Sequence, residues 1–254
     1  MSCVFITGAV KNTGYAIAEK FARNGYDVAI SSRNQEDLDA AVNKLKADYN
    51  VKVKGYVLNL TDVEQIKRVF FNIEQEFGRL DVFVANAANV GIDCDMQKIT
   101  EDYYNDIMDV NLKGTYFCCQ QAALIMCKYK CGSIVIISSV HSKACTWGRS
   151  LYAASKGALN ALMRSMAIEL ATYGIRTNCI IAGAIRTERW NVLTAEQIEA
   201  KRQNWPVGKE ATGEDIANGV FYLGTDLSKV VSGTELTVDS GILATLLPYQ
   251  GGRH

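Results

Sequence analysis

Short apolar runs alternate with longer stretches of helical periodicity along almost the whole chain. The runs are rich in β-branched residues, and those spelled VFIT, VFVAN and SIVIIS are apolar at consecutive positions. Parallel strands covered by helices on both sides have this character, because neither face meets water. Seven strands are predicted on this basis: Val4–Thr7, Asp27–Ser31, Val51–Leu58, Val82–Asn86, Ile134–Ser138, Arg176–Ile181 and Leu236–Val238.

The alternation predicts an α/β fold of the doubly wound Rossmann type, with a seven-stranded parallel sheet and helices on both faces. No repeat, low-complexity linker or break in composition divides the chain, so residues 1–254 are expected to form a single domain. The least regular region is 187–212, which holds Trp190, Trp205 and Pro206. We expect this region to be a substrate-loop insertion over the carboxyl edge of the sheet.

One predicted helix carries signals at both ends. The segment Thr61–Glu64 has the spacing of a capping box, in which the side chains of the first and fourth residues satisfy free backbone N–H groups. Gly78 follows the periodic stretch and fits the residue just past a helix C-terminus.

Composition narrows the classes of function. The chain has 27 basic and 27 acidic residues, with no basic arm, which argues against a nucleic-acid partner. No apolar run approaches the roughly 20 residues that cross a bilayer, and the N-terminus does not have the pattern of a signal peptide. Eight cysteines without a CxxC pair, and two histidines, do not form the pattern of a zinc site. We therefore expect no metal, no membrane partner, and reduced thiols in a cytoplasmic protein.

A glycine-containing turn joins the first predicted strand to the next helix. Gly8 allows a tight turn, and Gly14 lets the helix start approach a bound pyrophosphate. The helix N-terminus would add unpaired N–H groups and the positive end of its dipole. An ordinary strand–helix turn can carry the same glycines, and their spacing differs from the general dinucleotide fingerprint.

Tyr152 and Lys156 stand four residues apart in a predicted helix, so they share one helix face. An ammonium about 5 Å from a phenol, at an effective dielectric near 20, is worth about 3 kcal/mol, or roughly 2 pKa units. We therefore expect Lys156 to lower the pKa of Tyr152 toward the working pH, where proton transfer is efficient. By the motif alone, they could equally be two unrelated residues on a helix.

The glycine turn begins an ordered series of motifs that resembles the short-chain dehydrogenase/reductase family. Gly8 and Gly14 match the turn Thr-Gly-x-x-x-Gly-x-Gly, while Asn12 replaces the middle glycine. Asparagine tolerates left-handed backbone better than most residues, so the turn can survive. Further pieces follow in the family's order, with substitutions in several of them: Asn59–Asp62, Ala85–Ala88, Asp109–Asn111, Ile137–Ser139, Ala182–Thr187 and Val238–Gly241.

The resemblance implies a catalytic set of four residues. Tyr152 would exchange a proton with the oxygen of a ketone or secondary alcohol, and Ser139 would hydrogen-bond that oxygen. Lys156 would lower the pKa of Tyr152 and bind the nicotinamide ribose. Asn111 would anchor a water that relays protons to Lys156. The implied activity is a reversible hydride transfer, which the cofactor performs while the protein orients the reactants.

The second predicted strand suggests which cofactor is used. An NAD site places an acidic residue after this strand, but here Ser32 and Arg33 follow it. Arg33 can clamp a 2′-phosphate, and Lys11 is a second cation on the same side, so we expect NADP(H). The residues expected to bind the cofactor are Gly8, Lys11, Asn12, Thr13, Gly14, Ser32, Arg33, Asn59, Leu60, Asn86, Ala87, Tyr152, Lys156, Gly183, Ile185 and Thr187.

The substrate is less well defined by the sequence. Residues expected near it are Val90, Cys94, His141, Trp147, Ile185 and Trp190. The family reduces many kinds of carbonyl compound with the same four residues. Reduction of a 3-oxoacyl thioester on an acyl carrier protein and oxidoreduction of a hydroxysteroid are both open alternatives. A non-catalytic NADP(H) sensor on the same fold is a third, because several motifs carry substitutions.

Small residues recur on two predicted helices at a spacing that makes a flat face. They are Gly114, Cys118 and Ala122 in a helix over 101–129, and Ala153, Gly157 and Ala161 in the helix of Tyr152. Packing within the subunit would explain the same spacing. Members of the family build dimers and tetramers with these helices, so we expect a homotetramer. The apolar tail 242–249 would cover a neighbour's site or complete the core.

Overall fold

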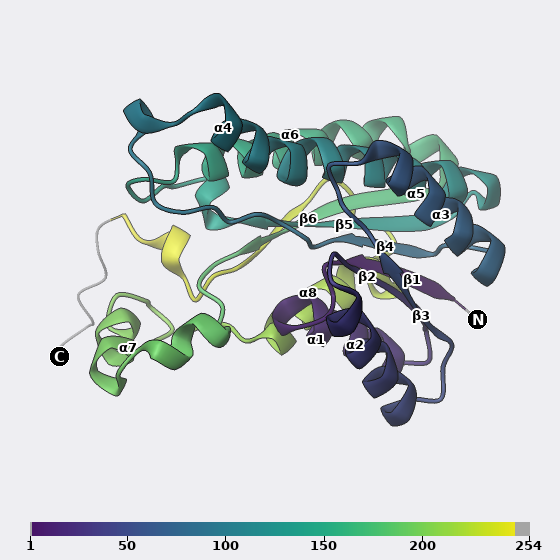
Figure 1. Ribbon diagram of the computed structural model, residues 1–254, viewed down its shortest axis with the longest axis horizontal. Helices are drawn as coiled ribbons and strands as arrows, with labels where there is room; N and C mark the ends of the chain where they lie inside the picture. Colours follow the sequence, from purple (N-terminus) through teal and green to yellow (C-terminus); the bar gives the residue numbers. More distant parts are fainter. Residues whose placement is uncertain (1, 247–254) are drawn as a thin grey trace.

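A computed structural model describes residues 2–246 and contains one parallel sheet with the strand order β3-β2-β1-β4-β5-β6-β7 (Figure 1). The predicted doubly wound α/β fold and all seven strands are therefore confirmed. The strand bounds are β1 Cys3–Thr7, β2 Asp27–Ser32, β3 Val53–Val57, β4 Val82–Ala85, β5 Gly132–Ser139, β6 Ile175–Ala182 and β7 Glu235–Val238.

Helices cover both faces of the sheet (Figure 1). One layer holds α1 (Asn12–Arg23), α2 (Gln35–Asp48) and α8 (Gly213–Gly224). The opposite layer holds α3 (Val63–Phe77), α4 (Glu101–Met108), α5 (Thr115–Tyr129) and α6 (Ser150–Glu169). The short helix α7 (Ala195–Arg202) lies beyond the sheet, on the side to which the strands point.

Alternate residues of each central strand enter one of two apolar clusters, because successive side chains point to opposite faces. In β1, Phe5 packs under α3 and α5, whereas Val4 and Ile6 pack against α1 and α8. The Phe5 ring lies 5.1 Å from that of Phe70 and 5.6 Å from that of Phe83, measured between centroids. These clusters fix the strand ends that carry the polar residues described below.

Two details of the predicted helices are wrong. The N-cap of α3 is Asp62, not Thr61: the Asp62 carboxylate accepts a 2.9 Å hydrogen bond from the backbone N–H of Gln65. The predicted helix over 101–129 is interrupted by a π-helical segment at Asp109–Gly114. At the other end of α3, Gly78 has a φ of +75°, which confirms it as the terminating glycine.

The stripe of small residues Gly114, Cys118 and Ala122 packs within the subunit. A Cβ added to Gly114 would lie 2.5 Å from the carbonyl oxygen of Leu60. Cys118 and Ala122 are buried in the apolar cluster between the sheet and the layer of helices that includes α5. The prediction that this stripe receives a partner helix is therefore wrong. On α6, by contrast, an added Cβ at Gly157 meets no atom within 4 Å.

After β6 the chain leaves the sheet in an excursion, which is held together at its base. A parallel bridge between Ile185 and Ala211 joins its two ends. The buried carboxylate of Glu210 accepts 2.8 Å hydrogen bonds from Arg186 and Arg202. These bonds, chiefly the one from Arg202, lower the pKa of Glu210 to about 2. The excursion carries α7 and a 3-10 helix at Glu188–Val192.

For two expectations from the sequence, only the described residues can be compared with the structure. Within residues 2–246, no helix combines the length and apolarity needed to cross a membrane. The predicted apolar tail 242–249 begins with a short 3-10 helix at Ile242–Ala244. The rest of that tail, from residue 247, lies outside the described residues.

Candidate functional site

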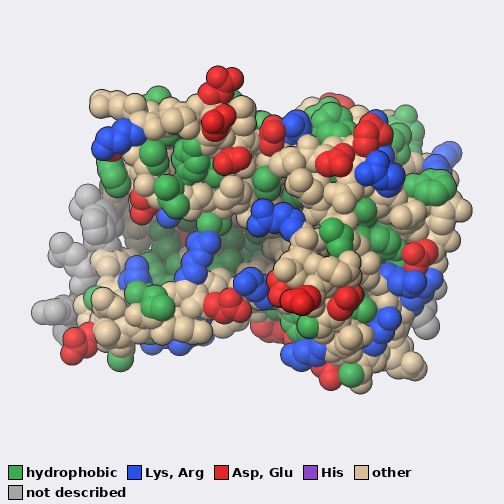
Figure 2. Space-filling model, viewed as in Figure 1, with side chains coloured by type: hydrophobic (Ala, Val, Ile, Leu, Met, Phe, Trp, Pro, Cys, Tyr) green, Lys and Arg blue, Asp and Glu red, His purple; other side chains and the backbone are tan. Residues whose placement is uncertain are grey.

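A cavity of about 590 Å³ lies at the carboxyl edge of the sheet. Its wall is made by segments that follow β1 to β6, together with one face of α6. Figure 2 shows a hollow on the side to which the strands point, with hydrophobic side chains deep inside and Lys or Arg side chains along its edges. Predicted residues on the wall are Gly8, Lys11, Asn12, Thr13, Gly14, Ser32, Arg33, Asn59, Leu60, Asn86, Ala87, Val90, Ser139, Tyr152, Lys156, Gly183 and Ile185.

The glycine turn is packed so closely that side chains cannot replace its glycines. A Cβ added to Gly14 would lie 2.2 Å from the carbonyl oxygen of Gly8. Gly8 has a φ of +66°, and its own added Cβ would lie 2.9 Å from the Cβ of Ala87. The amide of Asn86 donates a 2.9 Å hydrogen bond to the same Gly8 carbonyl. Strand β4 therefore holds the turn at the start of α1 in place.

Asn12 fills the position where the family turn has its middle glycine. Its φ is +50°, so it adopts the left-handed backbone that the sequence predicted it would tolerate. The N-terminus of α1 consequently opens toward the cavity and presents unpaired N–H groups to an anion. The close-packed turn and this helix end fit the pyrophosphate of a dinucleotide.

One end of the cavity is bounded by the residues after β2 and β3. Ser32, Arg33, Asn59 and Leu60 meet there. Arg33 is exposed and has no ion pair or hydrogen bond with any residue that the structure describes. None of the described residues on the whole wall is an Asp or Glu. A phosphate at this end would meet a free guanidinium and no opposing carboxylate.

Lys11 is engaged in an ion pair. Its ammonium lies 3.3 Å from a carboxylate oxygen of Glu188, and both side chains are exposed. The pair links the glycine turn to the 3-10 helix after β6, across the cavity wall. Its attraction is modest because water screens it.

The opposite end of the cavity holds Tyr152 and Lys156 on one face of α6. The Lys156 ammonium donates a 2.8 Å hydrogen bond to the carbonyl oxygen of Ile137 and lies 5.6 Å from the centroid of the Tyr152 ring. Burial lowers the pKa of Lys156 to about 8. Ser138 fixes this stretch of α6 to β5 by donating a 2.6 Å hydrogen bond to Asn160.

The pKa of Tyr152 is not lowered as predicted. Burial raises it, while the hydrogen bond with Ser139 and the charges of Arg149 and Arg189 act in the opposite direction. The Lys156 ammonium is directed to the carbonyl oxygen of Ile137, and its own pKa is lowered by burial. Surrounded by the protein alone, the Tyr152 phenol is therefore protonated at neutral pH.

Asn111 lies behind the wall of the cavity, in the π-helical segment. Its amide donates hydrogen bonds of 2.9 Å to the carbonyl oxygen of Asn89 and 3.1 Å to the hydroxyl of Ser155. Its carbonyl oxygen accepts a 2.7 Å bond from the N–H of Asn89. The side chain thus joins the loop after β4 to α6 directly, beside Tyr152 and Lys156.

His141 packs edge-on against the Tyr152 ring, with 5.6 Å between centroids. Its buried Nδ1 atom has no hydrogen-bond partner among the described residues. Burial, followed by the charge of Arg149, lowers the pKa of His141. Arg149 itself is held by an ion pair of 2.6 Å with Asp93 and a 2.8 Å bond to the carbonyl of Val90. His141, Arg149 and Asp93 therefore surround the end of the cavity that holds Tyr152.

Several predicted site residues do not reach the cavity wall. They are Cys94, Asn111, His141, Trp147, Thr187 and Trp190. Trp190 instead packs against Trp205, with 5.9 Å between ring centroids, and Trp147 is largely exposed. A position after a strand end places a residue near the site, but loop geometry decides where its side chain points. Arg189 also lines the cavity although it was not predicted from the sequence, where its only signal is a cation close behind Thr187.

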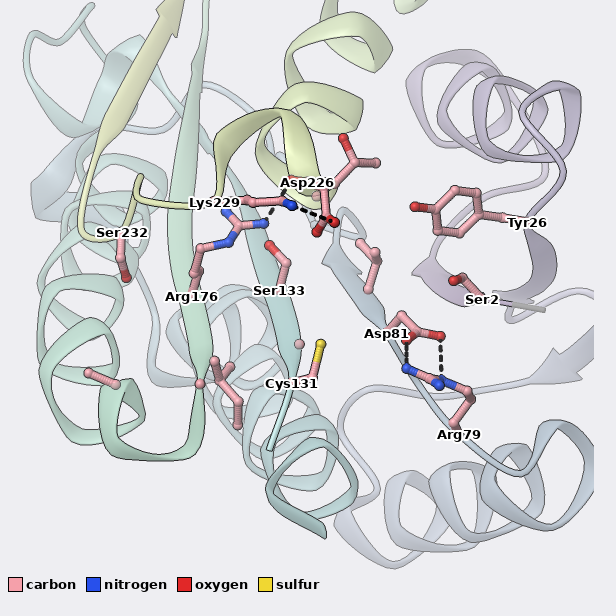
Figure 3. Close-up of a pocket in the computed structure, with 17 residues that line it drawn as sticks. Ser2, Tyr26, Arg79, Asp81, Cys131, Ser133, Arg176, Asp226, Lys229 and Ser232 are labelled. Atoms are coloured by element: carbon pink, nitrogen blue, oxygen red, sulfur yellow. Dashed lines mark hydrogen bonds and ion pairs between the residues drawn. The ribbon is translucent and has the colours of Figure 1, made fainter. Parts of the chain in front are cut away.

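A second cavity, of about 570 Å³, lies at the amino ends of β4, β5 and β6 (Figure 3). Its charged groups bind one another: Arg79 pairs with Asp81, and Lys229 with Asp226 at 3.3 Å. Arg176 donates to backbone carbonyls of the neighbouring loop. This cavity contains none of the predicted site residues, so the carboxyl edge is the better candidate.

Comparison with known proteins supports this choice. A family model described as Enoyl-(Acyl carrier protein) reductase matches residues 8–243. Sorbose reductase of Candida albicans is 34% identical over 241 residues, covering 93% of this chain and 85% of that protein. A 3-oxoacyl-[acyl-carrier-protein] reductase of Thermotoga maritima is 34% identical over 238 residues, covering 94% and 96%. A 3alpha-hydroxysteroid dehydrogenase of Mediterraneibacter gnavus is 32% identical over 235 residues, covering 92% and 94%.

Solved structures with the same fold contain nicotinamide cofactors. ElxO with NADP bound superposes with a TM-score of 0.90 at 32% identity, covering 96% of this chain and 99% of that one. Carveol dehydrogenase from Mycobacterium avium, in complex with NAD, gives a TM-score of 0.89 at 25% identity, covering 96% and 98%.

Proposed function

The chain belongs to the short-chain dehydrogenase/reductase family, and on that premise we propose that it is an NADP(H)-dependent oxidoreductase that interconverts a ketone and a secondary alcohol. One observation carries the proposal. A single cavity extends from the free guanidinium of Arg33, past the glycine turn, to Ser139, Tyr152 and Lys156. A dinucleotide site and an acid/base site are thereby joined.

The protein's own residues would handle the oxygen and its proton. Ser139 hydrogen-bonds the carbonyl oxygen of the substrate, and the Tyr152 phenol donates its proton to that oxygen during reduction. Burial keeps this phenol protonated at neutral pH, which suits the reductive direction. The bound cofactor supplies the hydride.

Lys156 and Asn111 would act behind these two. The Lys156 ammonium binds the nicotinamide ribose, and the positive charge beside the phenol stabilises the phenolate after proton transfer. Asn111 positions α6 against the loop after β4 through its hydrogen bonds to Asn89 and Ser155. We propose that a water held at this residue returns a proton to Lys156.

The preference for NADP(H) over NAD(H) rests on the adenosine end of the cavity. Arg33 is a free bidentate donor for a 2′-phosphate, and no carboxylate on the described wall would accept a hydrogen bond from a 2′-hydroxyl. ElxO, which has the same fold, was solved with NADP bound.

The substrate is proposed as a ketone of one of three classes: a ketose, a 3-oxoacyl thioester on an acyl carrier protein, or a keto-steroid. Each is suggested by the name of a relative that is at least 32% identical to this chain. We propose that the excursion over 187–212 covers the bound substrate. Its anchored base and its position beside the Tyr152 end support that role.

We further propose a cytoplasmic, single-domain homotetramer. All eight cysteines are free thiols, as in a reducing compartment. The open surface of α6 at Gly157 leaves room for the close approach of a partner helix.

The test follows NADPH oxidation against a panel of ketoses, 3-oxoacyl thioesters, keto-steroids and small ketones. One fast substrate is expected, with activity reduced about 100-fold or more by Tyr152→Phe and NADPH affinity retained. NADH serves as the comparison cofactor. Tight NADPH binding without turnover of any ketone, and without an effect of Tyr152→Phe, would contradict the proposal and indicate a cofactor sensor.

A further inference from the structure

Four cationic side chains line the cavity: Lys11, Arg33, Lys156 and Arg189. No carboxylate stands on the same wall among the described residues, although the whole chain has equal numbers of acidic and basic residues. Such a one-signed wall attracts anions. The proposed function assigns Arg33 to a 2′-phosphate and Lys156 to the ribose, and Lys11 is paired with Glu188. Arg189 has no assigned role.

Arg189 and Arg33 share a property that sets them apart from the other described arginines. Neither makes an ion pair or a hydrogen bond to any residue that the structure describes, and both line the cavity. Each other described arginine binds a carboxylate or backbone carbonyls; these are Arg23, Arg68, Arg79, Arg149, Arg164, Arg176, Arg186 and Arg202. The two free guanidinium groups therefore mark two separate anion positions in one cavity.

Arg189 lies near the end of the cavity that holds Tyr152. Its charge acts on the Tyr152 hydroxyl, where it stabilises the phenolate. Two carboxylates of neighbouring segments are already engaged, because Glu188 pairs with Lys11 and Asp93 pairs with Arg149. His141, which also packs on Tyr152, is held toward its neutral form by burial. Arg189 thus supplies a positive charge at this end that no protein group offsets within the described chain.

Both chain neighbours of Arg189 make side-chain contacts of their own. Glu188 is tied to the glycine turn through Lys11, and Trp190 packs against Trp205 with 5.9 Å between ring centroids. The side chain between these anchors is exposed and unbound. These anchors keep the guanidinium at the cavity wall, where it can bind an anion in a bidentate manner.

We propose that Arg189 binds an anionic group of the substrate, a carboxylate or phosphate carried by the same molecule as the ketone. This inference rests on the proposed oxidoreductase function and narrows its substrate class. A neutral ketose would leave the guanidinium without a partner, whereas a keto acid or a phosphorylated ketone would use it. A phosphate of the cofactor offers the same chemistry, and the experiment separates the two sources.

The experiment measures kcat/KM with NADPH for matched pairs of charged and neutral ketones. The pairs are acetoacetate, 4-oxopentanoate, 5-oxohexanoate and 4-acetylbenzoate, each against its methyl ester, and hydroxyacetone phosphate against hydroxyacetone. The wild-type enzyme is expected to prefer the charged member of at least one pair. Arg189→Gln is expected to lower that preference by about tenfold or more, and Arg189→Lys to lower it less, because lysine keeps the charge without the bidentate fork.

Arg33→Gln is the matched control, since it removes the other free guanidinium. It is expected to weaken NADPH binding, measured by fluorescence titration, without changing the charged-to-neutral ratio. If Arg189→Gln weakens NADPH binding like Arg33→Gln and leaves the ratio unchanged, Arg189 binds the cofactor and the inference is overturned. A wild-type enzyme that reduces neutral ketones as well as charged ones also overturns it, while the proposed function stands. If NADPH is oxidised with neither set but with a neutral ketose or keto-steroid, the inference is overturned and the proposed function stands; if no ketone of either panel is reduced, both fall.

Discussion

The ammonium of Lys156 donates a 2.8 Å hydrogen bond to the carbonyl oxygen of Ile137 in the interior of the protein. The side chain is buried, and no carboxylate contacts it among the described residues. Burial lowers its pKa from 10.5 to about 8 because a single hydrogen bond does not replace the lost hydration. The position that brings Lys156 close to Tyr152 therefore costs folding free energy whenever the lysine is charged.

This cost predicts how stability changes with pH. Below about pH 8 the folded state carries the full cost, and above about pH 10.5 neither the folded nor the unfolded state carries the charge. Between these values the unfolded state binds more protons, so the free energy of unfolding rises with pH, by up to about 3 kcal/mol from this group. Urea unfolding of wild type and Lys156→Met at about pH 7 and about pH 10 measures the effect. The variant's relative stability should be greater at the lower pH; an equal difference at both values would contradict the prediction.

The packing of Gly14 predicts a loss of cofactor binding on addition of one methyl group. In Gly14→Ala the Cβ would lie 2.2 Å from the Gly8 carbonyl oxygen and 2.7 Å from the Asn86 amide nitrogen, so the turn must shift. We expect NADPH affinity to fall about tenfold or more and unfolding free energy to fall by about 1–3 kcal/mol. Gly157→Ala is the matched control, because its Cβ meets no atom within 4 Å and alanine favours a helix. Wild-type NADPH affinity in Gly14→Ala would show that the turn does not contact the cofactor.

Arg33 should decide between the two nicotinamide cofactors. Its removal in Arg33→Gln deletes a charge-assisted contact to a 2′-phosphate, worth about 1.5–3 kcal/mol, and should weaken NADPH binding about 10- to 100-fold. NADH affinity should change little, because NADH carries no such phosphate. Arg68→Gln, on the surface of α3, controls for a general change in charge. Equal weakening for both cofactors would place Arg33 at a shared group instead.

The α6 surface predicts the response of the assembly to a bulky residue. In Gly157→Trp the indole would extend into open space around a single subunit, so the fold should be retained. A partner helix packed at this point would be displaced, and the solution mass should fall below that of the proposed wild-type tetramer. Light scattering coupled to size exclusion measures the mass, and circular dichroism measures the fold. A monomeric wild-type protein would refute the tetramer.

Prediction from sequence succeeded where a single local rule acts. Apolar runs such as VFIT lie in the centre of a sheet covered on both sides. A short run that is apolar at consecutive positions is typical of a strand buried on both faces. Asn12 adopts the left-handed backbone because the turn requires that conformation and asparagine is among the residues that tolerate it. Most of the cavity wall follows from strand ends, which a parallel sheet gathers at one edge.

Prediction from sequence failed where the direction of a side chain or packing between distant segments decides the structure. Nothing local to Trp190 signals that its partner is Trp205, fifteen positions further on. The expected influence of Lys156 on Tyr152 used their spacing alone, but the ammonium turns to Ile137 on a different element. The break in the helix over 101–129 reflects the contacts of Asn111 and Gly114 with distant loops. Such contacts exist only once the sheet has assembled.

The order of the strands has a consequence for folding during synthesis on the ribosome. The wall of the cavity draws on every strand end from β1 to β6, and the Thr7–Asn86 contact alone joins positions 79 residues apart. Pairings at such separation form slowly, because a long loop must close before they contribute. A growing chain on the ribosome therefore cannot offer a complete cofactor site until β6 and its loop have emerged. A nicotinamide dinucleotide would therefore bind only late in folding, and its binding would stabilise the molecules whose strands are already in register.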